Sequence, residues 1–486
     1  MSKFAKTVAR NSAFGMAAHI AIKVLSFLFS VLIIRQLGAD EFGQYSAVLA
    51  FGAIFVFFAD LGLSPYTVRQ VARLRDVPDS HSQIRALFGS VLALRFLLSL
   101  VTAVAIIVTA WLTGRPPEMV IGVALGTIGL ILYSVQGTAE SMLAGYERLD
   151  IVAGARVTQQ LAFVTLGAAA LIFATGYYGL IFANLTGIAL LTFVCWRAVQ
   201  RLDIRPASPL PAHWAPLIRA SIPFGMIAFT LGLSYKFDSV LLNIYAGDVA
   251  TGYYNSAYNL IFSVLVISNV VNTALYPSLS RQSVTMPQTL PAIQERMLRY
   301  LLIIALPIAV GGSLLAPQLI DVLYGVDYAP AALPLAILIW VVPLMFVTEF
   351  LGYVIVVEGA ERRVAWAIAI STTFNVALNF ALIPVFGLLA ASILTVVTEA
   401  ILLSQYSWLL RDKLRHVDWG LALWRPLLAL LVMAGVVIAL RDLFLPVTIL
   451  AGATAYLLLL LLGGVVGRTE FNLLTGFRRQ ASHSQG

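Results

Sequence analysis

The sequence has few charged residues and almost no cysteine. Only 11% of its 486 residues are charged, whereas 60% are hydrophobic and the mean hydropathy is +0.91. This composition excludes an ordinary soluble domain and indicates an integral membrane protein. The single cysteine, Cys195, lies in an apolar run. It excludes a disulfide framework and a thiolate metal site, and it predicts a residue packed in a core.

Catalytic motifs are also missing from the chain. The five histidines show no metal-ligand spacing, and the sequence contains neither a glycine-rich phosphate loop nor a nucleophile elbow. We therefore expect no cofactor, no metal site and no enzymatic activity. A membrane glycosyltransferase or polymerase that uses Asp40 and Glu41 as acid and base is a remote alternative. A turn cap is the better interpretation of these two residues.

Apolar runs predict an all-α membrane protein with about fourteen spanning helices, each near the roughly 20 residues that cross a bilayer. With a cytoplasmic N-terminus, 24 of the 31 Lys and Arg fall on the cytoplasmic side and three outside. The positive-inside rule then places both termini in the cytoplasm and explains the net charge of +8 without nucleic acid. The predicted spans are 14–34, 42–62, 86–112, 119–143, 151–174, 177–197, 217–246, 250–276, 298–323, 332–357, 364–383, 387–409, 421–440 and 444–466.

Four landmarks recur in the same order at offsets of 208 to 214 residues. Because six spans separate equivalent positions, the pattern predicts two parallel six-helix lobes with the same orientation. The predicted domains are residues 1–205, residues 206–412, and an appendage at 413–486 that holds the last two spans and a cytoplasmic tail. The landmark pairs are Gly38–Tyr45 with Gly247–Tyr254, Pro65–Gln70 with Pro277–Gln282, Gly145–Arg148 with Gly359–Arg362, and Tyr178–Ala183 with Phe386–Ala391.

The joint order of these motifs resembles that of a known transporter family. Leu37–Tyr45, Asp60–Ser64, Arg69–Arg73 and Asp238–Tyr258 look like the corresponding stretches of polysaccharide transporters, the Wzx-like flippases. These belong to the multidrug/oligosaccharidyl-lipid/polysaccharide (MOP) superfamily, with multidrug and toxic-compound extrusion (MATE) antiporters and lipid II flippases. The resemblance covers roughly residues 5 to 410. The predicted chain has two more spans than many relatives, and these two spans are similar to those of lipid II flippases.

The resemblance implies a V-shaped, MATE-like, alternating-access flippase of the bacterial inner membrane. Its expected cargo is an undecaprenyl-diphosphate-linked oligosaccharide for lipopolysaccharide or exopolysaccharide biosynthesis. Expected partners are membrane lipids, the polymerase and chain-length proteins of the same pathway, and H⁺ or Na⁺ as a coupling ion. A multidrug antiporter and a lipid II flippase remain alternatives.

Four basic residues fall within predicted spans, namely Lys23, Arg95, Lys236 and Arg156. A lysine at mid-span costs about 2.5 to 3.5 kcal/mol, so such residues usually face a protein interior or a wet cavity. We expect these cations to bind the diphosphate, because moving two negative charges through a low-dielectric region needs cationic partners. Structural ion pairs are the alternative, and Arg156, near the end of its span, is better placed to snorkel.

Acidic and amide side chains complete the candidate site. Asp60, Asp238 and Glu349 are candidate coupling acids, and an acidic cavity would favour the antiporter over the flippase. Amide side chains on the eighth and eleventh spans are candidates for contacts with sugar hydroxyls, and hydrogen bonds between helices are their alternative role. These amides are Asn255, Asn259, Asn272 and Asn375.

Overall fold

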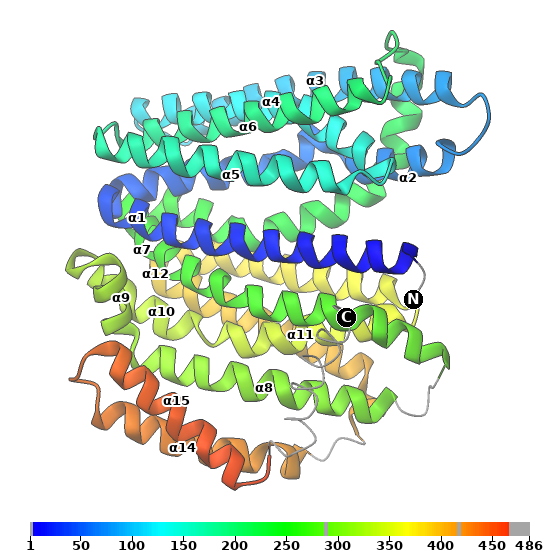
Figure 1. Cartoon of the computed structure of the whole chain (residues 1–486). Coiled ribbons are helices and arrows are strands. Elements are labelled where there is room, and N and C mark those ends of the chain that lie inside the picture. Colours follow the sequence, from blue (N-terminus) through cyan, green and yellow to red (C-terminus); the bar gives the residue numbers. More distant parts are fainter. Residues whose placement is uncertain (1–2, 286–289, 416–418, 466–486) are drawn as a thin grey trace. The chain divides into compact units, whose positions relative to one another are not determined.

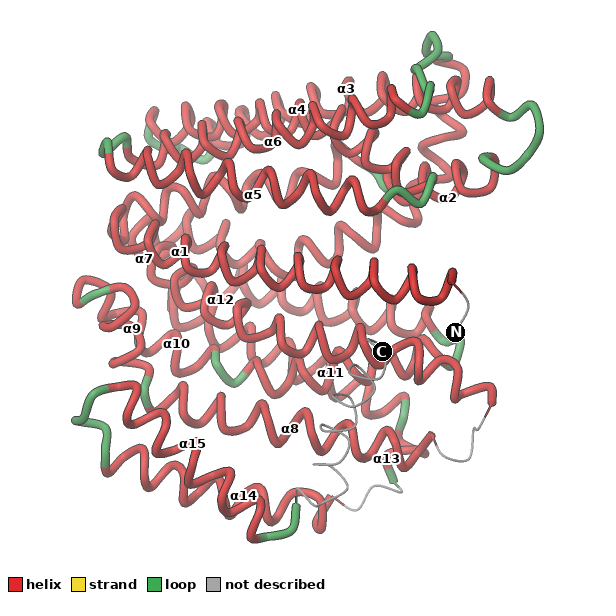
Figure 2. The backbone as a smooth tube through the Cα atoms, viewed as in Figure 1, coloured by secondary structure: helices red, strands yellow, loops and turns green. Residues whose placement is uncertain are grey.

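A computed structural model describes residues 3–285, 290–415 and 419–465, and these form helices and loops without a strand (Figure 2). Side chains within 3–20, 269–293 and 419–423, and at a few positions of 227–235, lie outside the description. The chain divides into two compact units, each described here by itself. The first comprises residues 1–259 and 368–394, and the second comprises 260–367 and 395–486. The limits of these two units differ from those predicted for the lobes and the appendage, and that predicted division remains a prediction.

In the first unit, four long helices lie side by side next to the short α2 (Figure 1). Their shared core surrounds Cys195, which is fully buried with Phe88, Met142 and Val199, as the apolar run predicts. Ion pairs placed on these helices are therefore held by a packed scaffold. The helices are α2 (Leu63–Leu74), α3 (His81–Leu112), α4 (Pro117–Gly145), α5 (Leu149–Ile172) and α6 (Gly176–Arg201).

Three helical stretches are much longer than a single span, because each joins two helices across a glycine whose backbone is not helical. The helices are α1 (Lys3–Asp60), α7 (Trp214–Thr285, after the 3-10 turn η1, Pro211–His213) and α12 (Glu361–Leu409). Gly38, Gly247 and Gly387 have φ of 72°, 86° and 53° at the kinks, values that glycine adopts without a Cβ penalty. Each stretch covers two predicted spans, and the connection between the two spans is a tight kink at the glycine.

The kinks of α1 and α7 bring equivalent residues of the predicted repeat into reciprocal contact. A Cβ at Gly43 would lie 1.8 Å from the carbonyl oxygen of Asp248, and a Cβ at Gly252 would lie 2.0 Å from that of Ala39. Each glycine thus packs on the residue that follows the kink of the other helix. The predicted repeat gives these residues equivalent positions, while superposition of complete lobes remains a prediction.

The second unit contains the remaining helices, in which α14 and α15 pack on α8 (Figure 1). Met433, Val437 and Leu460 are buried there, and the Tyr456 hydroxyl donates to the Ile303 carbonyl at 3.0 Å. The last two predicted spans are therefore an integral part of this unit's core. Its helices are the end of α7, α8 (Leu290–Leu314), α9 (Ala316–Tyr324), η3 (Val326–Ala331), α10 (Ala332–Leu338), α11 (Val341–Val357), both ends of α12, α13 (Arg411–Leu414), α14 (Trp419–Ala439) and α15 (Leu445–Leu462).

Two predicted spans of the second unit are broken. The range 298–323 is divided between α8 and α9, and the range 332–357 is divided between α10 and α11, where the chain bends by 41°. Pro317 stands in the first turn of α9, where a missing N–H costs little, so it marks a helix start. Among the described residues, eight helices, or nine with the bent pair, are long and apolar enough to cross a membrane. The protein is thus a multi-pass membrane protein, and fourteen spans remain a prediction.

Candidate functional site

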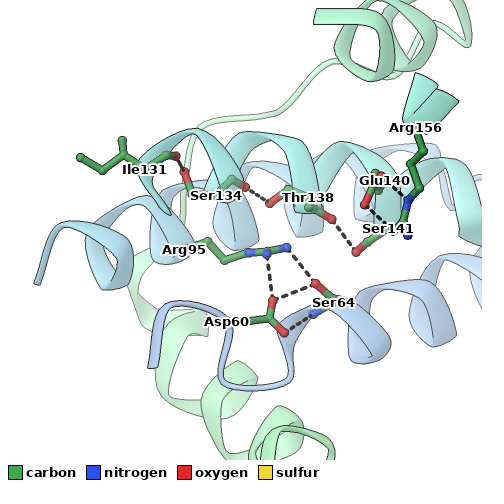
Figure 3. A network of polar contacts seen from close by, with 10 residues as sticks. Asp60, Ser64, Arg95, Ile131, Ser134, Thr138, Glu140, Ser141 and Arg156 are labelled. Atoms are coloured by element: carbon green, nitrogen blue, oxygen red, sulfur yellow. Dashed lines mark hydrogen bonds and ion pairs between the residues drawn. The ribbon is translucent and has the colours of Figure 1, made fainter. Parts of the chain in front are cut away.

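Arg95 on α3 is fully buried in the first unit and is held by an ion pair (Figure 3). Its Nη2 lies 2.9 Å from Oδ1 of Asp60, and its Nη1 donates to Oγ of Ser64 at 3.1 Å. The guanidinium carbon lies 5.1 Å from the ring centroid of Tyr133, a cation–π distance. Arg95 therefore binds a carboxylate of its own chain.

The local sequence explains how this pair is assembled. Asp60 ends α1, and Gly62, with φ of 79°, turns the chain so that α2 begins at once. Ser64, in the first turn of α2, then donates from Oγ to Oδ1 of Asp60 at 2.8 Å. On α4, Gly137 leaves room for Arg95, because a Cβ there would lie 2.4 Å from Nη2. The spacing Asp60–Ser64 was visible in the sequence, but the part played by Gly137 was not.

A cavity adjoins this ion pair within the first unit. It has a volume of about 310 Å³ between α1, α3, α4 and α6. Tyr133, whose ring faces Arg95, is one of its lining residues, along with the polar Tyr45, Thr127 and Asn184. Most of the other lining residues are apolar, so the cavity suits a largely hydrophobic group with a few polar atoms.

Arg156 forms a second ion pair, on α5. Its Nε and Nη2 donate to the two carboxylate oxygens of Glu140 on α4, at 3.2 and 3.3 Å (Figure 3). This is the bidentate geometry in which arginine binds a carboxylate or a phosphate. The Arg156 side chain is 60% exposed, whereas that of Glu140 is only 13% exposed.

The two lysines differ from the arginines. Lys23 is exposed on α1 and has neither an ion pair nor a hydrogen bond with any residue in the described part of the chain. Lys236 is half-buried on α7, where it interacts electrostatically with Asp238. Of the four basic residues predicted to bind the diphosphate, Lys23 is thus the one that has no carboxylate partner among the described residues.

The predicted coupling acids are hydrogen-bonded within the protein. Asp238 is only 3% exposed and accepts from the Tyr254 hydroxyl and, at 2.8 Å, from the Ser239 amide. In the second unit, Glu349 accepts from Oγ of Ser268 at 2.7 Å. These partners, and Asp60 in its ion pair, show how each carboxylate is held, while their role in ion coupling remains a prediction.

Three of the predicted sugar-binding amides bond to neighbouring groups. Asn259 donates to Oγ of Ser30 on α1 at 2.6 Å, and Asn375 accepts from the Asn379 amide at 2.8 Å. Asn255 accepts from Ser239 at 3.0 Å and donates to the Thr251 carbonyl at 3.0 Å, whereas the Asn272 side chain lies outside the described residues. Hydrogen bonding inside the bundle is the observed geometry, and sugar contacts remain a prediction.

The sequence reasoning missed the uncharged residues that organise these clusters. Tyr133, Gly137 and Tyr254 each contact a predicted site residue. Tyr254 is the last residue of the repeated Gly-x4-Gly-x-Tyr landmark, so the repeat itself was the available signal. Within the described residues no group of three or more His, Cys, Asp or Glu has the arrangement of a metal site.

Comparison with solved structures defines the fold class. The chain is similar to lipid II flippase MurJ in an inward closed conformation, with a TM-score of 0.76 and 14% identity over 93% of this chain and 99% of that one. It is also similar to an inward-facing MATE transporter of the MOP superfamily, with a TM-score of 0.64 and 15% identity over 81% of this chain and 96% of that one. The fold is therefore that of the MOP superfamily transporters, as the sequence motifs predict.

Sequence comparison defines the family within that class. The model described as "Polysaccharide biosynthesis protein" matches residues 8–283, more than half of the chain. The protein belongs to this family. A relative in Haloferax volcanii, named probable low-salt glycan biosynthesis flippase Agl15, is 21% identical over 81% of each chain. An uncharacterized membrane protein of Methanocaldococcus jannaschii, MJ1068, is 22% identical over 81% of this chain and 82% of its own length.

Proposed function

We propose that this protein is a flippase that moves polyprenyl-diphosphate-linked oligosaccharide across a membrane by alternating access. The observation that carries the proposal is Lys23, a cation on a membrane-spanning helix without a carboxylate partner in the described residues. An unpaired ammonium at this depth is costly unless it meets water or an anion. A diphosphate supplies the anion, and a lysine, as a mobile point charge, can release it again.

The family and its relatives support this choice of cargo. The matching family model is described by polysaccharide biosynthesis, and the relative in Haloferax volcanii is named as a glycan biosynthesis flippase. The proposed location is the bacterial inner membrane, and the positive-inside pattern supports an orientation with both termini in the cytoplasm. Polymerase and chain-length proteins of the same pathway are the proposed partners, and the protein itself has no enzymatic step to perform.

A cation-coupled antiporter is the second candidate, and particular contacts favour it. Arg95 and Arg156 are both paired with carboxylates, which removes two cations from the set available to an anionic cargo. Asp238 is buried and hydrogen-bonded, as a proton- or Na⁺-binding acid would be. Asp60 and Glu349 are the other proposed coupling acids. Lys23 distinguishes the candidates, because a cationic drug gains nothing from an unpaired ammonium.

Transport in proteoliposomes tests the proposal. The purified protein would be reconstituted with a fluorescent polyprenyl-diphosphate oligosaccharide in one sample and with a cationic dye in another. A membrane-impermeant quencher then reports which molecule crosses the bilayer. We expect translocation of the diphosphate lipid and none of the dye. Dye transport driven by a proton or sodium gradient, without movement of the lipid, would establish the antiporter instead.

A further inference from the structure

A basic pocket lies at the end of the α5–α6 hairpin, apart from the clusters described above. Three arginines line it: Arg148, directly before α5, and Arg197 and Arg201 on the last turns of α6. The pocket has a volume of about 570 Å³, and Ile151 and Phe193 form part of its apolar wall. The last turns of α6 and the residue before α5 therefore present three guanidinium groups to one space.

The pocket holds more positive than negative charge. Arg148 donates from Nε and Nη2 to the two oxygens of Asp150, at 3.2 and 3.4 Å. Arg197 and Arg201 are exposed, and neither has an ion pair with a carboxylate of the described residues. The guanidinium carbon of Arg197 lies 5.8 Å from the Phe193 ring centroid. This cation–π contact stabilises the guanidinium group but leaves its positive charge in place.

The orientation of α6 directs this charge away from the core of the first unit. Cys195 and Val199 are buried in that core, while Phe193, Arg197 and Arg201, four residues apart, share another face. The side chains of Phe193 and nearby Leu149 are 63% and 60% exposed. Cations next to exposed apolar side chains are typical of the boundary between the headgroups and the hydrocarbon of a bilayer.

We infer that this pocket binds the headgroup of an anionic phospholipid. The phosphate would accept hydrogen bonds from Arg197 and Arg201, for which guanidinium donors are well matched. The acyl chains would lie against Phe193 and Ile151. Basic pockets between helices at the cytoplasmic ends of spans bind acidic headgroups in this manner, and the positive-inside pattern assigns this end of α6 to the cytoplasmic leaflet. The inference is independent of the cargo proposed above.

Lipid titration of the full-length protein in detergent tests the inference. Native mass spectrometry would measure binding of phosphatidylglycerol and of phosphatidylcholine to the wild type and to Arg197→Gln/Arg201→Gln. We expect the double variant to bind phosphatidylglycerol about 30-fold more weakly, at about 1 kcal/mol for each arginine near an anionic surface, with phosphatidylcholine unchanged. Arg197→Lys/Arg201→Lys keeps the charge and should retain most of the affinity for phosphatidylglycerol. Retained affinity in this variant would show that the loss in the Gln variant comes from the missing charge and not from misfolding.

The matched control removes the same charge elsewhere. Arg362 and Arg363 are exposed at the start of α12 and have no ion pair with a described residue, so Arg362→Gln/Arg363→Gln should leave the affinity within about twofold. Equal losses in the two Gln variants would mean general electrostatic attraction and would overturn the site. Displacement of phosphatidylglycerol by polyprenyl diphosphate at lower concentration would assign the pocket to the cargo and also contradict the inference.

Discussion

Replacing Asp60 by asparagine tests whether the buried ion pair of the first unit holds the fold together. Asn keeps the size of the side chain and a hydrogen-bond acceptor for Ser64, but it removes the charge that faces Arg95. At the observed 2.9 Å, two unit charges interact by about 6 kcal/mol at an effective dielectric constant of about 20. Part of this gain offsets the cost of taking both charges out of water.

The net effect follows from the burial of the two partners. Arg95 is fully buried, so Asp60→Asn leaves an uncompensated charge inside the bundle, which typically costs about 3 to 5 kcal/mol. The Asp60 side chain is 17% exposed, and water that reaches it favours the lower end of this range. The double variant Asp60→Asn/Arg95→Met removes both charges and should recover most of the loss.

Unfolding by sodium dodecyl sulfate, followed by circular dichroism in mixed micelles, would measure these free energies. Arg148→Gln is the matched control, because it breaks the ion pair with Asp150, in which both side chains are exposed, and should cost about 1 kcal/mol or less. If Asp60→Asn is as stable as the wild type, or if the double variant is no better than the single ones, the structural role assigned to Arg95 is wrong.

The remaining predictions concern backbone contacts and topology. Gly137→Ala places a methyl group against the Arg95 guanidinium and should lower the unfolding free energy by about 1 to 3 kcal/mol in the same assay. Gly43→Ala places a methyl group against a backbone carbonyl of α7 and should lower the unfolding free energy further. Gly52→Ala has open space around it and should be neutral or slightly stabilising. Equal effects of all three substitutions would refute the close contacts. Reporter fusions at Gly486 should be active only in the cytoplasm, and a periplasm-active fusion would overturn the topology.

One pair of the landmarks was readable from the sequence because its glycines answer backbone constraints. Gly38 and Gly247 keep their spacing since both kinks need positive φ, and Gly43 and Gly252 keep theirs since each meets the other helix's backbone. The reciprocal packing of Gly43 and Gly252 was not readable. It depends on the contact between α1 and α7, which lie far apart in sequence.

The candidate site was predictable only as a set of residue types. Mid-span charges identified Asp60 and Arg95, but their pairing depends on how α1, α2 and α3 pack. Tyr133 and Gly137 gave no signal, because an aromatic ring and a glycine are ordinary in membrane helices. The contrast between paired Arg95 and unpartnered Lys23 therefore required the structure.

Charge reversal at Lys23 tests the proposed anionic cargo most directly. Proteoliposomes containing Lys23→Glu would be compared with Lys23→Arg and the wild type for translocation of the diphosphate lipid, at equal amounts of folded protein. We predict that Lys23→Glu abolishes translocation, because repulsion in a low-dielectric path reaches several kcal/mol, and that Lys23→Arg keeps partial activity. Wild-type translocation by folded Lys23→Glu would contradict the proposal that this lysine meets an anionic cargo.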